Sequence, residues 1–262
     1  MTKLGSFLLL CTSIAAAQPQ LELPRLGFVA DKNQFLRPLY GFAGNFTLGD
    51  SVGEDVISAA SSAKFVLAKT SSQIAVLDRN GATLSATDAA DGPALFAFTP
   101  GGDPALVWLN GPGALYVWKQ DHFEAAPVSA DVLAGAVTAL AMEGTDMVRF
   151  LVTRADGMWR VEMGLSDGSL QSQAALPDVA SGAAILLDTN LLYTNGTVLV
   201  IRAEDGSERS IDTGVTIGAL ASLRSEWVHV TEQGTTRHFA VRLTAGREQV
   251  WQLPEEAACC PQ

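Results

Sequence analysis

The sequence predicts an all-β fold: a β-propeller of five four-stranded blades, with an N-terminal hairpin that forms a partial sixth blade. A short apolar segment recurs five times at intervals of about forty residues, and each copy is followed by turn residues and a more polar run. No stretch has the sustained 3.6-residue apolar periodicity, with caps, that predicts a helix. Four antiparallel strands in about forty residues are the unit of a propeller blade.

The recurrent segment is β-branched or aromatic in character, as a strand requires. The five copies are Ile74-Ala75-Val76, Leu115-Tyr116-Val117, Trp159-Arg160-Val161, Val198-Leu199-Val200 and Phe239-Ala240-Val241. Their final valines lie 41, 44, 39 and 41 residues apart. The turns that follow are rich in Asp, Asn and Gly, because glycine accepts positive φ and Asp or Asn can close an Asx turn. We interpret each copy as the third strand of a blade.

Two apolar runs precede each third strand and supply the first and second strands. They are residues 55–60 and 64–69, 93–98 and 105–109, 137–142 and 148–153, 183–188 and 190–194, and 217–223 and 226–231. The polar run after each turn supplies the fourth strand, at residues 82–87, 123–128, 169–176, 208–212 and 248–253. One thin sheet cannot bury both of its faces, so we expect the blades to pack against each other around a ring. A β-sandwich or another all-β repeat is the alternative.

An additional hairpin is predicted over residues 26–40, with its turn at Asp31–Gln34. We expect it to supply the third and fourth strands of an incomplete blade, and residues 41–44 and 49–53 to form a loop into the first full blade. The C-terminus offers no matching first and second strands. We expect the hairpin to close the ring within the chain; alternatively, its unpaired inner edge accepts a strand from a partner.

The N-terminus predicts a secretory signal peptide over residues 1–17. Lys3 precedes an apolar run of about 14 residues that ends at Ala15-Ala16-Ala17, too short for the roughly 20 residues of a bilayer-spanning helix. A short membrane anchor is the alternative. The predicted organisation is therefore a signal peptide (1–17), an N-terminal hairpin and linker (18–54), propeller repeats (55–254) and a C-terminal tail (255–262). We expect a secreted or periplasmic protein without a stable membrane span.

Charge and cysteine content exclude several classes of protein. The net charge is −11, and loss of residues 1–17 would remove one lysine and no acid, so binding to nucleic acid is not expected. Cys259 and Cys260 are adjacent, so they cannot close a loop of a disulfide framework. A strained ring between them, an intermolecular bridge, a bound metal or simple oxidisable thiols remain open.

Candidate chemistry is sparse, and we expect no catalytic residue, metal site or cofactor. Gly49-Asp50-Ser51-Val52-Gly53 matches the G-x-S-x-G pattern, but no strand-helix alternation surrounds it. A two-residue loop at Gln233-Gly234 would place His229 opposite His238, yet a zinc site needs three or four ligands. The Asp-Gly pairs predict Asx turns rather than calcium loops. The five tryptophans are expected in blade packing, with carbohydrate binding as the alternative.

Tyr116-Val117-Trp118, Val76-Leu77-Asp78 and the Asp-Gly hairpins give the chain a resemblance to a known group. Over residues 55–254 it resembles secreted bacterial β-propeller proteins of the YVTN, NHL or WD-repeat-like kind. The Gly-His and Trp-Asp pairs of true WD repeats are absent from the sequence. The resemblance implies an architecture and no particular activity.

The loops between second and third strands should gather at one rim of the ring, where binding usually resides on a rigid scaffold. They are residues 70–73, 110–113, 154–156, 195–196 and 233–234, and they are short and polar. We predict a non-enzymatic scaffold that binds a protein partner, or another ligand, through these loops. The predicted contact residues are Asn110, Arg154, Asp156, Asn195 and Gln233.

Two alternatives to this function remain. One is an enzyme, either a lactonase-like hydrolase or a quinone-dependent oxidoreductase, with its active site at the central channel. It requires acids, histidines or arginines that converge on the channel. The other is a structural role in which a partner strand completes the N-terminal hairpin.

Overall fold

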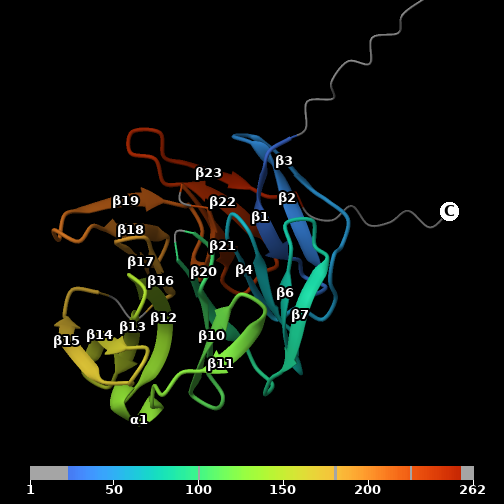
Figure 1. The fold of residues 1–262 in the computed structure, drawn as a ribbon. Coiled ribbons are helices and arrows are strands. Elements are labelled where there is room, and N and C mark those ends of the chain that lie inside the picture. Colours follow the sequence, from blue (N-terminus) through green and yellow to red (C-terminus); the bar gives the residue numbers. More distant parts are fainter. Residues whose placement is uncertain (1–22, 100, 180–181, 225, 255–262) are drawn as a thin grey trace, which may run out of the picture.

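Six antiparallel sheets are arranged around a common centre in the computed structural model, which describes residues 23–99, 101–179, 182–224 and 226–254 (Figure 1). Five sheets have four strands and the first has three, each in strict chain order. The fold is therefore a six-bladed β-propeller whose first blade is incomplete, as the repeat predicted. The expected signal peptide at 1–17 and the cysteines of the tail at 255–262 lie outside the described residues.

The strands occupy nearly the predicted segments. The first three sheets are β1 (Arg25–Ala30), β2 (Leu36–Phe42) and β3 (Asn45–Leu48); β4 (Ser58–Ser61), β5 (Val66–Lys69), β6 (Gln73–Leu77) and β7 (Thr83–Asp88); and β8 (Ala94–Phe98), β9 (Ala105–Leu109), β10 (Ala114–Lys119) and β11 (His122–Ala125). The last three are β12 (Ala136–Glu143), β13 (Met147–Arg154), β14 (Gly157–Gly164) and β15 (Leu170–Leu176); β16 (Ala184–Leu187), β17 (Asn190–Asn195), β18 (Val198–Arg202) and β19 (Glu208–Asp212); and β20 (Ile217–Arg224), β21 (Trp227–Glu232), β22 (His238–Arg242) and β23 (Gln249–Gln252).

One short helix, α1 (Ala130–Leu133), was not anticipated and lies in the connection between β11 and β12. Ser129 caps it, because its hydroxyl accepts a hydrogen bond from the backbone N–H of Asp131. Leu133 is buried and anchors the helix to the fourth blade. No helix in the described part of the chain is long and apolar enough to cross a membrane.

The third strands form the repeating core of the blades. In each full blade one third-strand residue pairs with a second-strand residue that is fully buried: Val76 with Leu67, Val117 with Leu106, Val161 with Phe150, Ile201 with Leu192 and Val241 with Val228. The predicted alignment was therefore wrong by one residue in the fifth sheet, where Ile201 and not Val200 holds the repeat position. A one-residue slip moves a side chain to the other face of a strand.

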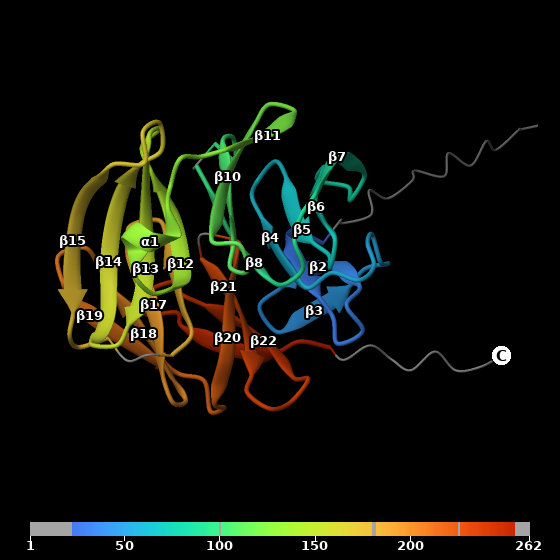
Figure 2. The ribbon, with the colours of Figure 1, turned by 90° about the horizontal axis from the view of Figure 1, so that it is seen from below.

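The inner strands of the five full blades form a ring. β4, β8, β12, β16 and β20 contact one another in turn, and β20 also contacts β4 directly (Figure 2). β1 contacts both β4 and β20, so the first sheet lies against the point where the ring closes. Leu26, Phe28 and Val29 of β1 are buried there. The inner edge of the hairpin is covered within the chain.

The first sheet supplies the second, third and fourth strands of its blade, not the third and fourth as predicted. The backbone N–H of Val56 donates to the carbonyl of Gln34, and β4 begins two residues later. The β1–β2 turn therefore lies at the end of the ring where first strands begin, which is also where second-to-third-strand turns lie. β3 takes the place of the fourth strand, although residues 45–48 belonged to the linker in the prediction.

The first and last blades have no strand in common, and a cluster of apolar side chains joins them. Its buried members are Leu26, Val29, Leu39, Leu223, Trp227, Ala240 and Leu253. Phe46 of β3 meets Trp227 and Trp251 of the last blade edge-on, with ring centroids 5.7 and 5.9 Å apart. We call this junction between the first and last blades the seam. Aromatic pairs of this geometry add to the stability that burial alone provides.

Candidate binding rim and seam pocket

The five predicted contact residues lie on or beside the second-to-third-strand turns of four different blades. Asn110, Asp156 and Gln233 are exposed in turns, Asn195 is exposed at the end of β17, and Arg154 is partly buried at the end of β13. All belong to one end of the ring, which we call the candidate rim. They are distributed around this rim, and none of them lines the pocket described below.

Hydrogen bonds fix the turns of the candidate rim to the connections between blades. The N–H of Gln233 donates to the carbonyl of Thr216 at 2.8 Å, and the N–H of Ile217 donates to the carbonyl of Gly196 at 3.2 Å. In the second sheet the N–H of Ala89 donates to the carbonyl of Ser72 at 2.8 Å. Each of these bonds ties a turn to a neighbouring segment, so three of the six rim turns are fixed to the segments beside them.

Arg154 is the most constrained of the predicted contact residues. Its Nε donates to the carbonyl of Leu133 at 3.0 Å, and its guanidinium lies 4.7 Å from the centre of the Trp159 ring. The indole N–H of Trp159 donates to Asp156 Oδ1 at 2.9 Å. Arg154, Trp159 and Asp156 therefore form a preorganised group on the rim of the fourth blade. The sequence indicated Arg154 and Asp156 but not the tryptophan that joins them.

A sixth rim turn, between β1 and β2, was not assigned to the site from the sequence. Asp31 Oδ1 accepts hydrogen bonds from the N–H groups of Asn33 and Phe35, and Asp31 Oδ2 lies 2.8 Å from Arg37 Nε. Burial raises the pKa of Asp31, but the bonds from Arg37 and the backbone outweigh it, and the net pKa is lowered. Lys32 and Asn33 are exposed at the tip of this turn.

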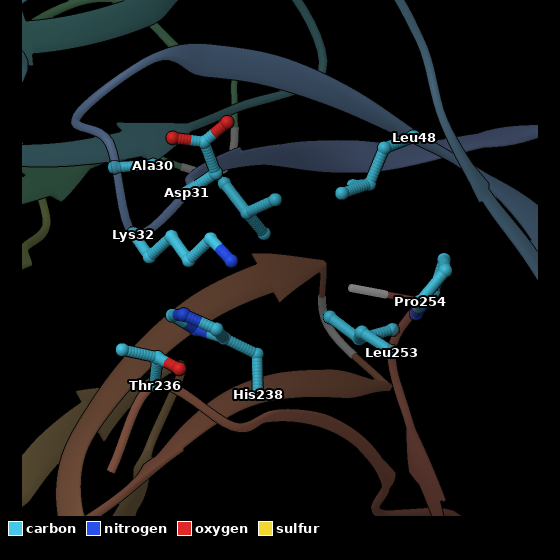
Figure 3. Close-up of a pocket in the computed structure, with 9 residues that line it drawn as sticks. Ala30, Asp31, Lys32, Leu48, Thr236, His238, Leu253 and Pro254 are labelled. Atoms are coloured by element: carbon cyan, nitrogen blue, oxygen red, sulfur yellow. The ribbon is translucent and has the colours of Figure 1, made fainter. Parts of the chain in front are cut away.

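An apolar pocket opens beside this turn, at the seam (Figure 3). Its apolar lining comes from both blades: Val29, Ala30, Leu48, Leu253 and Pro254. Its polar lining comes from the two rim turns and β22: Asp31, Lys32, Thr236 and His238. The cavity volume of the pocket is about 30 Å³, which is enough for a small group. It is too small for a drug-sized ligand or a typical cofactor.

Two histidines meet at the seam, although not in the predicted register. The turn spans residues 233–237, and His229 pairs with Ala240 while Thr231 pairs with His238. The slip is two residues, which keeps both imidazoles on one face. His229 Nε2 and His238 Nδ1 are 2.9 Å apart, and the rings stack with an interplanar angle of 6°. Burial, assisted by His238, lowers the pKa of His229 to about 3.

The remaining candidates have structural roles. Asp167 and Asp205 accept hydrogen bonds from the N–H groups of Ser169 and Ser207, which confirms the Asx turns predicted there. Ser51 donates its hydroxyl hydrogen to the carbonyl of Gly53 in the connection between β3 and β4. Within the described residues, no three His, Cys, Asp or Glu side chains are arranged to hold a metal.

Lys69 is a buried cation that the sequence did not single out. Its side chain is fully covered at the end of β5, and Nζ donates to the carbonyl of Thr70 at 2.5 Å and to that of Ser71 at 3.4 Å. Burial lowers the pKa of Lys69, and the carboxylate of Asp91 partly opposes this shift. The lysine thus holds a rim turn from below.

The chain matches no protein-family model and no curated protein. A chain of the nidogen–laminin complex superposes with a TM-score of 0.59, at 12% identity, over 87% of this chain and 92% of that one. The β-propeller domain of Myceliophteria thermophila Cps50 (Swd1) gives a TM-score of 0.52 at 11% identity, and 88% of each chain is covered. At these identities the likeness concerns the fold alone.

PorZ, a surface component of the type-IX secretion system of Porphyromonas gingivalis, is also similar. Its identity to this chain is 13% and its TM-score 0.47. The match covers 90% of this chain, which spans 39% of the length of PorZ.

Proposed function

We propose that this protein is a non-enzymatic, extracytoplasmic β-propeller scaffold that binds a protein partner through the candidate rim. The observation that carries the proposal is the hydrogen bonding of the rim turns to the connections between blades. A surface held in this way loses little conformational freedom when a partner docks, and this reduces the cost of association. Short polar turns on such a surface suit a broad protein contact.

The contact residues that we propose are Asn110, Arg154, Asp156, Asn195 and Gln233. Arg154 and Trp159 make the fourth blade the strongest candidate for the centre of the interface. Binding energy in protein interfaces concentrates in a few residues, and arginine, tryptophan and tyrosine are enriched among them. Arg154 is already oriented by Leu133 and Trp159, so binding need not order it.

Two further observations support this reading. A propeller of similar fold was solved in the nidogen–laminin complex, so the architecture is found in a protein–protein assembly. Residues 1–17 have the pattern of a secretory signal peptide, and we propose a secreted or periplasmic location on that basis. We further propose membership of the secreted bacterial YVTN- or NHL-like propellers. Mass spectrometry of the exported protein tests the proposed signal peptide and location, because the mature chain should begin near residue 18.

Partner capture with matched variants tests the binding proposal. The tagged full chain is expressed in the organism that encodes it, and co-purifying envelope proteins are quantified. The rim variant carries Arg154→Ala and Asn195→Ala. Its control carries Arg79→Ala and Asn80→Ala, an exposed pair of the same residue types in a turn between third and fourth strands, at the opposite end of the ring.

We expect one protein to be recovered in stoichiometric amount with the wild type and with the control. The rim variant should recover it about tenfold less, as the loss of a central arginine predicts. Equal recovery by the rim variant would contradict the proposal. So would the recovery of a tightly bound metal or cofactor with the pure protein, since that favours the enzyme.

A further inference from the structure

We propose that the seam pocket binds the C-terminus of a partner polypeptide. The last side chain, a small aliphatic group, enters the pocket, and the terminal carboxylate pairs with Lys32. This inference rests on the proposed protein-binding function and identifies the chemical group that the candidate rim recognises.

The walls of the pocket define the apolar half of the ligand. Val29, Leu48 and Leu253 come from both sides of the seam, and Val29 and Leu253 are almost fully buried. The cavity volume of about 30 Å³ exceeds the roughly 10–15 Å³ that a single water needs, so the pocket admits a small aliphatic group such as methyl or isopropyl. Alanine or valine fits this space, whereas an aromatic ring does not.

Lys32 defines the charged half of the ligand. Its side chain is exposed, and its ammonium group lies in the space between Asp31 and His238 (Figure 3). The described part of the chain supplies no ion-pair partner for it. The acid that also lines the pocket, Asp31, is held by Arg37 and two backbone N–H groups, so its charge is already compensated. An incoming carboxylate therefore meets Lys32, which has no ion-pair partner among the described residues.

Because Lys32 itself lines the pocket, a chain terminus is favoured over an internal acidic residue. At a C-terminus, the carboxylate and the side chain are attached to the same carbon atom. In an extended internal segment, the nearest acidic side chain belongs to the next residue, which points to the opposite face of the strand. Only the terminus presents both groups to one small pocket without a bend.

The location of the pocket matches this role. It opens between the β1–β2 turn and the turn at residues 233–237, both of which belong to the candidate rim. A partner docked on the rim would thus bring its terminus to the seam. Terminal carboxylate capture is an established mode of peptide recognition.

Fluorescence anisotropy with defined peptides tests the inference on the full chain. The probe is a fluorescein-labelled pentapeptide that ends in valine with a free carboxylate, and its twin carries a C-terminal amide. Four variants are compared: Lys32→Met, Lys32→Arg, Thr236→Trp to cover the mouth, and Lys64→Met as a control at an exposed lysine of the opposite rim. Thr236 is exposed, so the tryptophan does not disturb the core.

We expect the acid peptide to bind the wild type saturably. The amide peptide should bind the wild type about three- to tenfold more weakly, and the acid peptide should bind Lys32→Met more weakly by the same factor, as a partly exposed ion pair predicts. Lys32→Arg should keep the affinity, Thr236→Trp should lose saturable binding, and Lys64→Met should behave as wild type. Equal binding of acid and amide, or unchanged binding by Thr236→Trp, would overturn the inference.

The two experiments fail separately. If partner capture depends on Arg154 and Asn195 but the peptide does not bind, the pocket assignment is wrong and the rim stands. If the peptide binds as expected but no protein is captured through the rim, the scaffold proposal is wrong.

Discussion

Acidification should destabilise this protein through His229, because the folded chain cannot readily accept a proton there. His229 is buried, and its Nε2 is 2.9 Å from His238 Nδ1. A proton on His229 would be held without water and beside a second imidazole. Of the charged groups across the pocket, Lys32 would oppose a proton on the histidine pair and Asp31 is already paired with Arg37. Burial therefore keeps His229 neutral in the folded state at mildly acidic pH.

The difference in pKa between the two states sets the size of the effect. His229 has a folded pKa of about 3, against 6.5 for an unperturbed histidine. Between these values the unfolded chain binds a proton that the folded chain does not, so stability falls as pH decreases from 6.5 toward 3. At pH 4.5 this proton uptake by the unfolded chain lowers the free energy of unfolding by about 2–3 kcal/mol relative to neutral pH, at roughly 1.4 kcal/mol per pKa unit.

Urea unfolding monitored by tryptophan fluorescence at several pH values between 7.5 and 4.5 measures this loss. The comparison is with His229→Gln, whose own destabilisation is the same at every pH. The wild type should lose about 2–3 kcal/mol more than this variant across the range. Parallel pH profiles for the two proteins would refute the reasoning.

A histidine on the opposite rim provides a control of opposite sign. Hydrogen bonds to Asp121 and Glu124 raise the pKa of His122. Its contribution to stability is therefore present at low pH and is lost as pH rises through the folded pKa. Relative to the wild type, His122→Gln should therefore lose more stability at acidic pH than at neutral pH. His229→Gln should lose less stability than the wild type on acidification.

Three further predictions concern the core, the seam and the rim. Ile201→Ala should cost about 2–4 kcal/mol of unfolding free energy, and Val200→Ala clearly less, because only Ile201 is buried at the repeat position; equal costs in urea unfolding would contradict the register. Gly27→Ala should cost about 1–3 kcal/mol, since its Cβ would lie 2.9 Å from Ser61 Oγ, while Gly101→Ala, with open space around it, should stay within about 0.5 kcal/mol of wild type. Finally, the wild type should gain stability relative to Lys69→Met as pH rises toward 10.5, because burial lowers the pKa of Lys69 and the folded chain releases its proton first; a flat difference between pH 8 and 10.5 would contradict this.

The repeat predicted the fold because the same physical demand recurs in every blade. A thin sheet must pack both faces, so its second strand carries consecutive buried apolar residues, as in Val66–Ala68 and Ala105–Leu109. The second strand of the third sheet and the fourth strand of the fifth sheet were predicted to the residue. The start of β4 was predicted three residues too early, because Asp55–Ile57 belong to the connection between β3 and β4.

Features set by contacts between distant segments escaped the sequence. Val198-Leu199-Val200-Ile201 is apolar throughout, so nothing local decides which of its residues faces Leu192. The hairpin at His229 and His238 has the same ambiguity, because residues 233–237 permit several turn lengths and the local sequence does not decide which residue lies opposite His229. The predicted register differs from the observed one by two residues, and a shift of two leaves both side chains on the same face of the sheet. The predicted proximity of His229 and His238 was therefore found.

The carboxylate site that we propose lies where the repeat breaks, and there is a physical reason for this. Each of the five full blades must satisfy the same packing between its second and third strands. At the seam, the first sheet contributes no inner strand, and β20 contacts β4 directly while β1 packs against both. The side chains of the first and last sheets therefore need not pack closely along the full length of their strands. The pocket, the histidine pair and Lys32 lie at this junction, so the recognition group that we propose there leaves the repeating core unchanged.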